Sequence, residues 1–83
     1  IDVRSTLEHK LDHIDGDVLI PHREVVEEVS KRFPDKTTKL NLYCRAGGRA
    51  GVATNALREL GYTQVSNVGG IDNARRLRNI VEE

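Results

Sequence analysis

The only cysteine of the chain, Cys44, begins a six-residue segment whose composition suits anion chemistry. The segment reads Cys-Arg-Ala-Gly-Gly-Arg and ends at Arg49. A thiol beside arginine side chains and near a helix N-terminus is favoured as the thiolate, which is the nucleophilic form. A lone cysteine is more often a buried, unreactive side chain, because free cysteine packs as a small hydrophobe. The arginines and glycines around Cys44 favour the reactive interpretation.

The two glycines of this segment, Gly47 and Gly48, permit positive φ and leave room beside the backbone. A loop whose successive N–H groups point inward forms a nest for an anion, and a helix that begins near residue 50 adds its positive end. We therefore expect one loop to stabilise both a thiolate and an anionic substrate. The candidate site residues are Cys44 as nucleophile, with Arg45, Ala46, Gly47, Gly48, Arg49 and Ala50 as substrate-binding residues.

The residues around this segment predict a strand before it and a helix after it. Apolar and polar residues alternate over 39–43, as in a strand. Apolar residues at helical spacing predict a helix over 50–60, and Gly61 follows where a left-handed C-terminal glycine belongs. Ligands of open α/β sheets bind beyond the carboxyl ends of strands, and Cys44 lies at such an end.

Three further short segments, at residues 1–3, 18–20 and 64–68, also predict strands. Helices are expected to alternate with them, beginning at Ser5 and covering 22–33 and 71–81. Strand and helix alternating four times predict an α/β fold, with a small mostly parallel sheet of about four strands and helices on both faces. No linker or repeat interrupts the chain, so residues 1–83 are expected to form a single domain.

Helical spacing also predicts which side chains face the core. The expected inward residues of the helices other than 50–60 are Leu7, Leu11, Val25, Val26, Val29, Phe33, Ile71, Ala74, Leu77 and either Ile80 or Val81. Arg75, Arg76 and Arg78 are expected on a solvated outer face, with docking to an acidic partner as the alternative. Gly69 and Gly70 are expected to form a tight turn.

The composition argues against several functions. Thirteen basic and thirteen acidic side chains give a net charge of +0, which argues against nucleic-acid binding. No apolar run approaches the roughly 20 residues that span a bilayer. One cysteine excludes an intrachain disulfide and a multi-cysteine zinc site, and His9, His13 and His22 lack metal-ligand spacing. We expect no metal, and the small aliphatic core without an obvious exposed apolar stripe favours a monomer.

Several motifs together resemble the rhodanese-type sulfurtransferases. The segment 44–49 is similar to their active-site loop, which commonly reads Cys-Arg-x-Gly-x-Arg or Thr. Further matches follow in family order over 2–4, 13–21 and 61–70, although Asp17 stands where the family usually has alanine. The resemblance covers nearly the whole chain. Its compact length and early Asp-x-Arg motif are similar to the small single-domain phage-shock rhodaneses.

This resemblance implies a specific reaction. Cys44 would take the outer sulfur of thiosulfate as a persulfide and pass it to cyanide or a thiol, in a double displacement. The resemblance implies that the loop amides stabilise the thiolate and persulfide and that Arg45 and Arg49 orient the sulfonate. It implies no metal or organic cofactor, and bracing roles for Asp2, Arg4 and His13. It also implies a bacterial periplasmic location, with the cytoplasm as the alternative. Because the chain opens directly on strand-like residues, we expect a mature or trimmed form.

Two other functions are weighed against this one. Cysteine-dependent phosphatases and arsenate reductases also hold a thiolate in a nest of amides, but the phosphatase loop carries its arginine six positions after the cysteine. Here that position is Ala50, and the arginine comes at five. The second alternative is a persulfide carrier or interaction module that acts with a protein partner. Inactive modules of this kind typically lack the cysteine, so its presence favours an active enzyme.

Overall fold

The computed structural model describes residues 1–78 of the chain. The elements are α1 (Thr6–Leu11), η1 (His22–Glu24), α2 (Val25–Arg32), β1 (Leu40–Cys44), α3 (Gly48–Glu59), β2 (Val65–Gly70) and α4 (Ile71–Leu77). Each predicted helix is present, and α2 is entered through the short 3-10 turn η1. The predicted continuation of the last helix to residue 81, with Ile80 or Val81 inward, lies outside the described residues.

The strand that leads to the cysteine, β1, pairs with β2 in a parallel sheet. Leu40 lies opposite Val65, and Cys44 lies opposite Gly70. The register shifts between Leu42 and Cys44, so the pairing becomes irregular where the cysteine loop begins.

The segment 1–3 extends this sheet on the other side of β1. Asp2 makes isolated parallel bridges both to β1 and to the segment 18–20. Val3 N donates to the Tyr43 carbonyl at 2.9 Å. The order across the sheet is therefore 18–20, 1–3, β1 and β2. This confirms the α/β fold with a small parallel sheet, although the first two segments are too short to form more than bridges.

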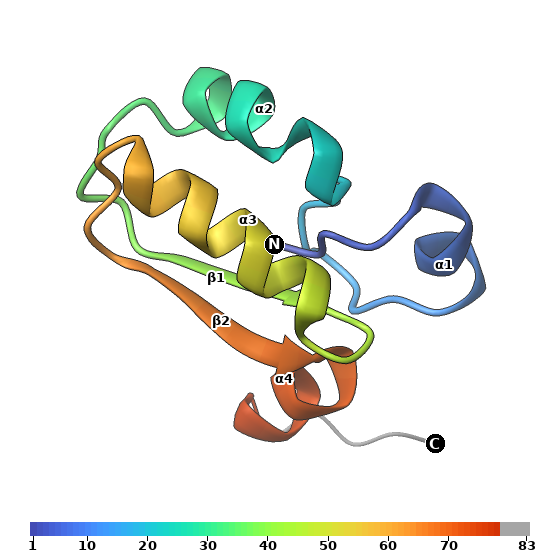
Figure 1. The fold of residues 1–83 in the computed structure, drawn as a ribbon. Coiled ribbons are helices and arrows are strands. Elements are labelled where there is room, and N and C mark those ends of the chain that lie inside the picture. The colour runs from blue at the N-terminus through green and yellow to red at the C-terminus, as the bar shows by residue number, and fades with distance from the viewer. Residues whose placement is uncertain (79–83) are drawn as a thin grey trace.

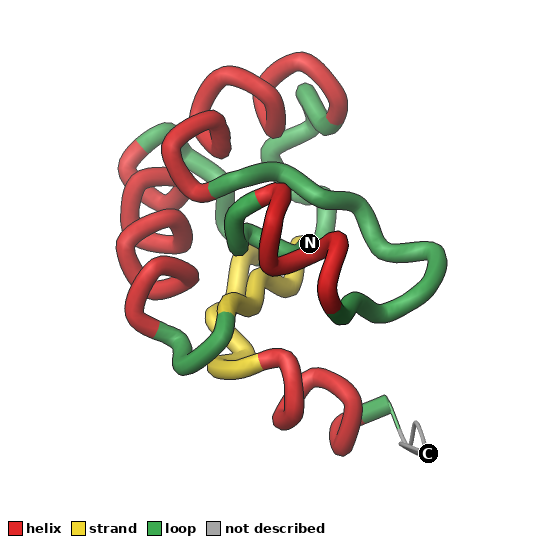
Figure 2. The backbone as a smooth tube through the Cα atoms, turned by 90° about the vertical axis from the view of Figure 1, so that its right-hand side faces the viewer, coloured by secondary structure: helices red, strands yellow, loops and turns green. Residues whose placement is uncertain are grey.

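Helices cover both faces of the sheet, as predicted (Figure 1). The side chains of β1 alternate between two cores, because successive strand residues point to opposite faces. Leu40, Leu42 and Cys44 pack in the larger core, to which α2 and α3 contribute. Tyr43 packs in the smaller core with Ile71 of α4. The turned view in Figure 2 also shows α3 and α4 separated by the two strands.

The prediction that α1 buries Leu7 and Leu11 is wrong. These side chains are 65% and 78% exposed, and no residue of this six-residue helix is buried. The reason is its position: α1 stands beside the sheet and not over one of its faces (Figure 1). Val26 and Leu77 are also exposed, contrary to expectation.

The prediction of a solvated arginine face on α4 is wrong for Arg75. This side chain is buried and binds Asp12, with Arg75 Nη2 2.6 Å from Asp12 Oδ1. Helical spacing could not reveal that the outer side of α4 meets the segment 12–17. The predicted tight turn at residues 69–70 is also wrong, because these glycines form the end of β2.

Candidate active site

Cys44 ends β1 with its side chain in the larger core and only 1% exposed. The chain then turns through residues 45–47 and enters α3 at Gly48. Gly47 adopts the left-handed conformation, with φ +97°. Its N–H donates to Cys44 Sγ at 2.9 Å. The strand end and the helix start therefore fold the loop around the sulfur, as the glycines predicted.

Two opposing effects set the pKa of the Cys44 thiol. Burial raises it, because the charged thiolate loses hydration, and this is the largest single effect. The backbone N–H groups of Ala50, Ala46, Gly47 and Arg49 bond to the sulfur and favour the thiolate. Together the four amides outweigh burial, so the pKa of Cys44 lies below its ordinary value.

The end of β2 packs directly against this loop. A Cβ atom at Gly70 would overlap the Arg45 carbonyl oxygen, and one at Gly47 would lie 3.2 Å from the Gly69 Cα. Glycine at residue 70 therefore allows the close approach of the two backbones. Gly70 thus contacts the active-site loop. The prediction of a turn at residues 69–70 did not include this role.

Asn67 of β2 forms a second link to the loop. Its Nδ2 donates to the Gly47 carbonyl at 2.9 Å, and its Oδ1 accepts from Gly69 N at 2.8 Å. One side chain thus fixes both the left-handed glycine of the loop and the backbone opposite it. Asn67 is not among the predicted site residues. The available signal was an asparagine two residues before a glycine, which is the spacing of an Asx turn.

Glu8 of α1 binds the last arginine of the loop. Arg49 Nη1 lies 2.5 Å from Glu8 Oε1, and Nη2 lies 2.9 Å from Oε2, so the pair is bidentate. The Arg49 guanidinium lowers the pKa of Glu8 to about 2, and Glu8 raises the pKa of Arg49. The sequence identified Glu8 only as the capping-box partner of Ser5, a role that the structure confirms.

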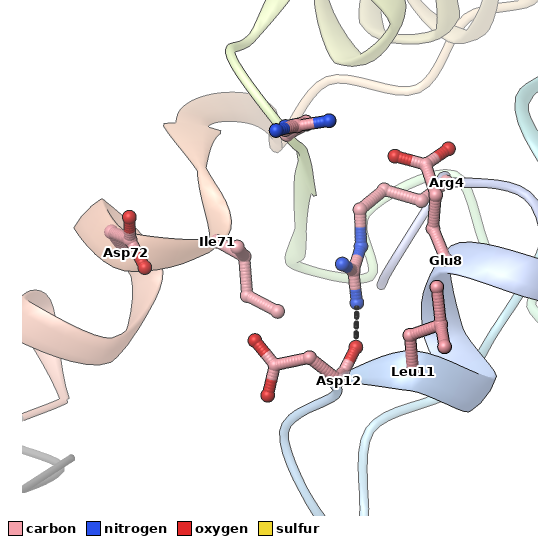
Figure 3. Close-up of a pocket in the computed structure, with 7 residues that line it drawn as sticks. Arg4, Glu8, Leu11, Asp12, Ile71 and Asp72 are labelled. Atoms are coloured by element: carbon pink, nitrogen blue, oxygen red, sulfur yellow. Dashed lines mark hydrogen bonds between the residues drawn. The ribbon is translucent and has the colours of Figure 1, made fainter.

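A buried ion pair between Arg4 and Asp2 supports the region around α1. Arg4 Nη2 lies 2.8 Å from Asp2 Oδ2, and both side chains are almost completely buried. Arg4 Nη2 also donates to the Asp12 carbonyl at 2.5 Å, just after α1 (Figure 3). This contact connects the sheet to the end of α1, and it agrees with the bracing role that the family resemblance implies for Asp2 and Arg4. His13 instead lies at the surface, with Nε2 2.9 Å from Asp15.

A pocket of about 340 Å³, which we call the Arg45 pocket, opens between α1, the loop and α4. Its lining residues are Arg4, Glu8, Leu11, Asp12, Arg45, Ile71 and Asp72, most of which Figure 3 labels. Within residues 1–78, Arg45 makes no side-chain hydrogen bond or ion pair, and it is exposed. Arg45 is therefore a loop cation without an ion-pair partner among the described residues.

The geometry thus brings Cys44 together with the amides of four of the six predicted binding residues. The other two, Arg45 and Gly48, are exposed members of the same loop. The part of the chain that the structure describes contains no cluster of three metal-ligating side chains and no helix able to cross a bilayer. A buried thiol whose pKa is lowered by backbone amides is favoured as a nucleophile, and the same amides can stabilise an anionic substrate.

Comparisons with known proteins define the class to which this site belongs. A family model described as a rhodanese-like domain matches residues 1–76. The chain therefore belongs to the rhodanese-like family, as its motifs predicted, and it is an enzyme of the sulfurtransferase class.

Among individual relatives, the chain is similar to the thiosulfate sulfurtransferase PspE of Escherichia coli strain K12. The two are 41% identical over 71 residues, which cover 86% of this chain and 68% of PspE. The structure also resembles a solved rhodanese with anions from E. coli, with a TM-score of 0.81 and 39% identity. That match covers 87% of this chain and 85% of the solved one, and it confirms the fold.

Proposed function

We propose that this protein is a thiosulfate sulfurtransferase that carries the transferred sulfur on Cys44. The observation that carries the proposal is the set of backbone N–H groups around the Cys44 sulfur, which lower the pKa of a thiol that burial alone would raise. These donors are fixed before substrate arrives, so they need no reorganisation during the reaction.

The first half-reaction is attack of the Cys44 thiolate on the outer sulfur of thiosulfate. The S–S bond of thiosulfate breaks, sulfite leaves with the electron pair, and Cys44 becomes a persulfide. In the second half-reaction a thiophile, either cyanide or a thiol, attacks the outer sulfur and Cys44 returns to the thiolate. This is a double displacement, for which ping-pong kinetics are expected.

The proposed binding residues have different roles in this reaction. The loop amides stabilise the thiolate and then the persulfide, while Arg45, as a cation at the Arg45 pocket, attracts the sulfonate end of thiosulfate. Arg49, the last residue of the loop, has its charge balanced by Glu8. We expect Arg49 to orient the donor through a fixed guanidinium position, and Arg45 to bind the sulfonate with a guanidinium that has no ion-pair partner within residues 1–78.

Intact mass spectrometry after incubation with thiosulfate tests this proposal. We expect the wild-type protein to gain one sulfur atom, to lose it on addition of cyanide, and to produce thiocyanate. Cys44→Ser, which keeps the size of the side chain, should gain nothing. A wild-type protein that gains no sulfur from thiosulfate or any other sulfane donor would contradict the proposal.

The alternative of a persulfide carrier shares the first half-reaction. A carrier would gain sulfur from thiosulfate but turn over only with a partner protein and not with small thiols.

We further propose that residues 1–83 form a single domain and act as a monomer. The family resemblance also leads us to propose that the protein works in the bacterial periplasm.

A further inference from the structure

The short helix α1 is positioned by polar contacts, and none of its residues is buried. The capping box of Ser5 and Glu8 closes its first turn, and the Glu8 carboxylate binds Arg49 of the cysteine loop. After its last turn, the Asp12 carbonyl accepts a hydrogen bond from Arg4. The structure thus fixes α1 beside the active-site loop, although no side chain of this helix belongs to either core.

The two leucines of α1 face solvent next to the Arg45 pocket. Leu7 and Leu11 are both mostly exposed, and Leu11 lines the pocket itself. They lie about one helical turn apart, so they share one side of α1. Figure 2 looks onto this side of the molecule and shows α1 in front of the sheet. We call Leu7 and Leu11 the leucine pair.

The shape and size of the leucine pair favour a partner that binds briefly. Small-molecule sites are concave and enclose most of their ligand, whereas these side chains project from the outside of a helix. A stable interface with a second copy of the chain would bury roughly 1,200–2,000 Å² in total, which is far more than two leucines offer, but transient interfaces are smaller. An apolar patch beside a reactive cysteine therefore suits a macromolecule that docks while it reacts.

The Arg45 pocket also carries exposed carboxylates. Asp12 and Asp72 line it, and Figure 3 shows Asp72 and Leu11 on opposite sides. Both carboxylates bind Arg75, with Nη2 2.6 Å from Asp12 Oδ1 and Nη1 3.5 Å from Asp72 Oδ1. The Arg75 side chain is buried, whereas those of Asp12 and Asp72 are 60% and 85% exposed. A partner therefore meets two carboxylates that share one guanidinium.

We propose that this surface docks the sulfur acceptor, and that the acceptor is a protein cysteine with apolar residues on one side of it and basic residues on the other. The apolar residues would cover the leucine pair, and the basic residues would pair with Asp72. Once sulfite has left, the acceptor thiolate would meet Arg45 on the loop side of the pocket. This inference rests on the proposed function and adds the acceptor class to it. It differs from the carrier alternative, because small thiols and cyanide still turn over.

The transfer step balances without a further reactant. The acceptor thiolate, RS⁻, attacks the outer sulfur of the Cys44 persulfide, Cys–S–SH. The S–S bond to Cys44 breaks, and its electron pair returns to Cys44 as the thiolate. The product is the persulfide of the acceptor protein, RS–SH.

Three short peptides with blocked ends and one cysteine test the proposal. The first has leucines on one side of the cysteine and lysines on the other, the second has serines in place of the leucines, and the third has glutamates in place of the lysines. Each is made in both chain directions and compared at equal thiolate concentration, with thiosulfate as donor. We expect kcat/KM of the first peptide to exceed that of the other two by roughly five- to tenfold.

Two variants assign these preferences to residues. Leu7→Gln should lower the preference for the leucine peptide over the serine peptide by roughly threefold or more, and leave turnover with 2-mercaptoethanol unchanged. It should fold, because Leu7 belongs to neither core. Asp72→Asn should lower the preference for lysine over glutamate by roughly two- to threefold. Leu60→Gln is the matched control, since Leu60 is an exposed leucine at the end of α3, outside the Arg45 pocket, and it should alter neither preference.

Equal kcat/KM for the three peptides, or a leucine preference that survives in Leu7→Gln, would overturn the docking surface. Sedimentation of the wild-type protein tests the second copy as occupant. A dimer that is lost in Leu7→Gln would assign the leucine pair to self-association and overturn the acceptor assignment. Failure of the wild type to gain sulfur from thiosulfate would instead contradict the proposed function itself.

Discussion

At the scale of single residues, the charge beside the nucleophile is set by a carboxylate that comes from 41 residues earlier in the chain. Arg45 and Arg49 look equivalent in the sequence, since both belong to the cysteine loop. In the structure Arg49 is neutralised by Glu8, whereas Arg45 is exposed. Two arginines of one motif therefore have different electrostatic roles.

Glu8→Gln tests this division of charge. The substitution removes a negative charge near the loop and leaves the Arg49 charge uncompensated, which favours the Cys44 thiolate. We expect the pKa of Cys44 to fall below its wild-type value. The rate of alkylation by iodoacetamide, which is neutral, measured across pH, reports this value.

Glu27→Gln serves as the control for Glu8→Gln, because Glu27 is an exposed glutamate of α2 paired with Lys31. This variant should titrate like the wild type. A Cys44 pKa that is unchanged or raised in Glu8→Gln would show that the Glu8–Arg49 pair does not tune the thiolate.

The residues of the loop itself could be read from the sequence, because a cysteine, two arginines and two glycines in six positions constrain the chemistry strongly. The contacts of Glu8 and Asn67 could not. A capping-box spacing defines what Glu8 does within its own helix, and it carries no information about Arg49. Long-range side-chain partners depend on how elements pack, which local spacing does not encode.

At the scale of elements, β2 supports the cysteine loop through Asn67. The side chain connects the Gly47 carbonyl to Gly69 N, so it couples a strand to the loop that packs against it. Gly70 completes this support by allowing the Arg45 carbonyl to approach closely. The geometry of the loop around the sulfur therefore depends on β2 as well as on β1 and α3.

Asn67→Ala tests the support from β2. The loss of two hydrogen bonds in an exposed position should cost about 1 kcal/mol of unfolding free energy, measured by urea denaturation. The loosened amides should raise the pKa of Cys44 and slow persulfide formation more than the modest loss of stability explains. Ser66→Ala, a change at the exposed neighbouring residue, should alter neither quantity. A Cys44 pKa equal to that of the wild type would show that Asn67 does not position the loop.

The elements also show where helical periodicity misleads. Leu7 and Leu11 have the spacing of a buried face, but α1 lies at the edge of the sheet and exposes both. On α2, by contrast, the same kind of spacing correctly placed Val25 and Val29 in the core. Periodicity predicts that a face is apolar, and only the position of the helix decides whether another layer covers it.

At the scale of the whole molecule, two ion pairs hold α4 to the segment 12–17. Arg75 binds Asp12, and Arg78 Nη1 lies 2.7 Å from Asp17 Oδ1. Tyr43 also donates its hydroxyl to Asp17 at 2.6 Å. Asp17 is the position where the sequence departs from the usual alanine of the family. In this chain the departure supplies a link between the two ends of the described fold.

A double-mutant cycle of Asp17→Asn and Arg78→Gln measures this link. Burial raises the pKa of Asp17, because the carboxylate loses hydration. The hydrogen bonds from Arg78 and Tyr43 lower this pKa by more than burial raises it, so it lies below the ordinary 3.8. A lowered carboxylate pKa contributes stability above the unfolded value and loses it as pH falls through the folded value. We expect a coupling free energy between Asp17 and Arg78 of about 1 kcal/mol at pH 7, because the exposure of Arg78 limits the strength of the ion pair. This coupling should disappear well below pH 3.8, where Asp17 is protonated.

Thermal unfolding of the four proteins of this cycle, at pH 7 and in acid, provides the measurement. Because Arg76 is exposed, Arg76→Gln is the matched arginine control and should show no coupling to Asp17. A coupling that is the same at both pH values would contradict an ionic origin.

The central position of residues 1–3 in the sheet has a consequence for how the protein folds. This segment pairs with β1, whose residues follow about 40 positions later, and with the segment 18–20. The entropy of closing such long loops opposes folding until distant parts of the chain have met, and this slows folding relative to helical proteins. Residues 1–3 can therefore pair in the sheet only after the distant strand β1 has approached them. The loop around Cys44 then reaches its final geometry late in folding, because two residues that bind it, Glu8 and Asn67, lie far from it in the chain.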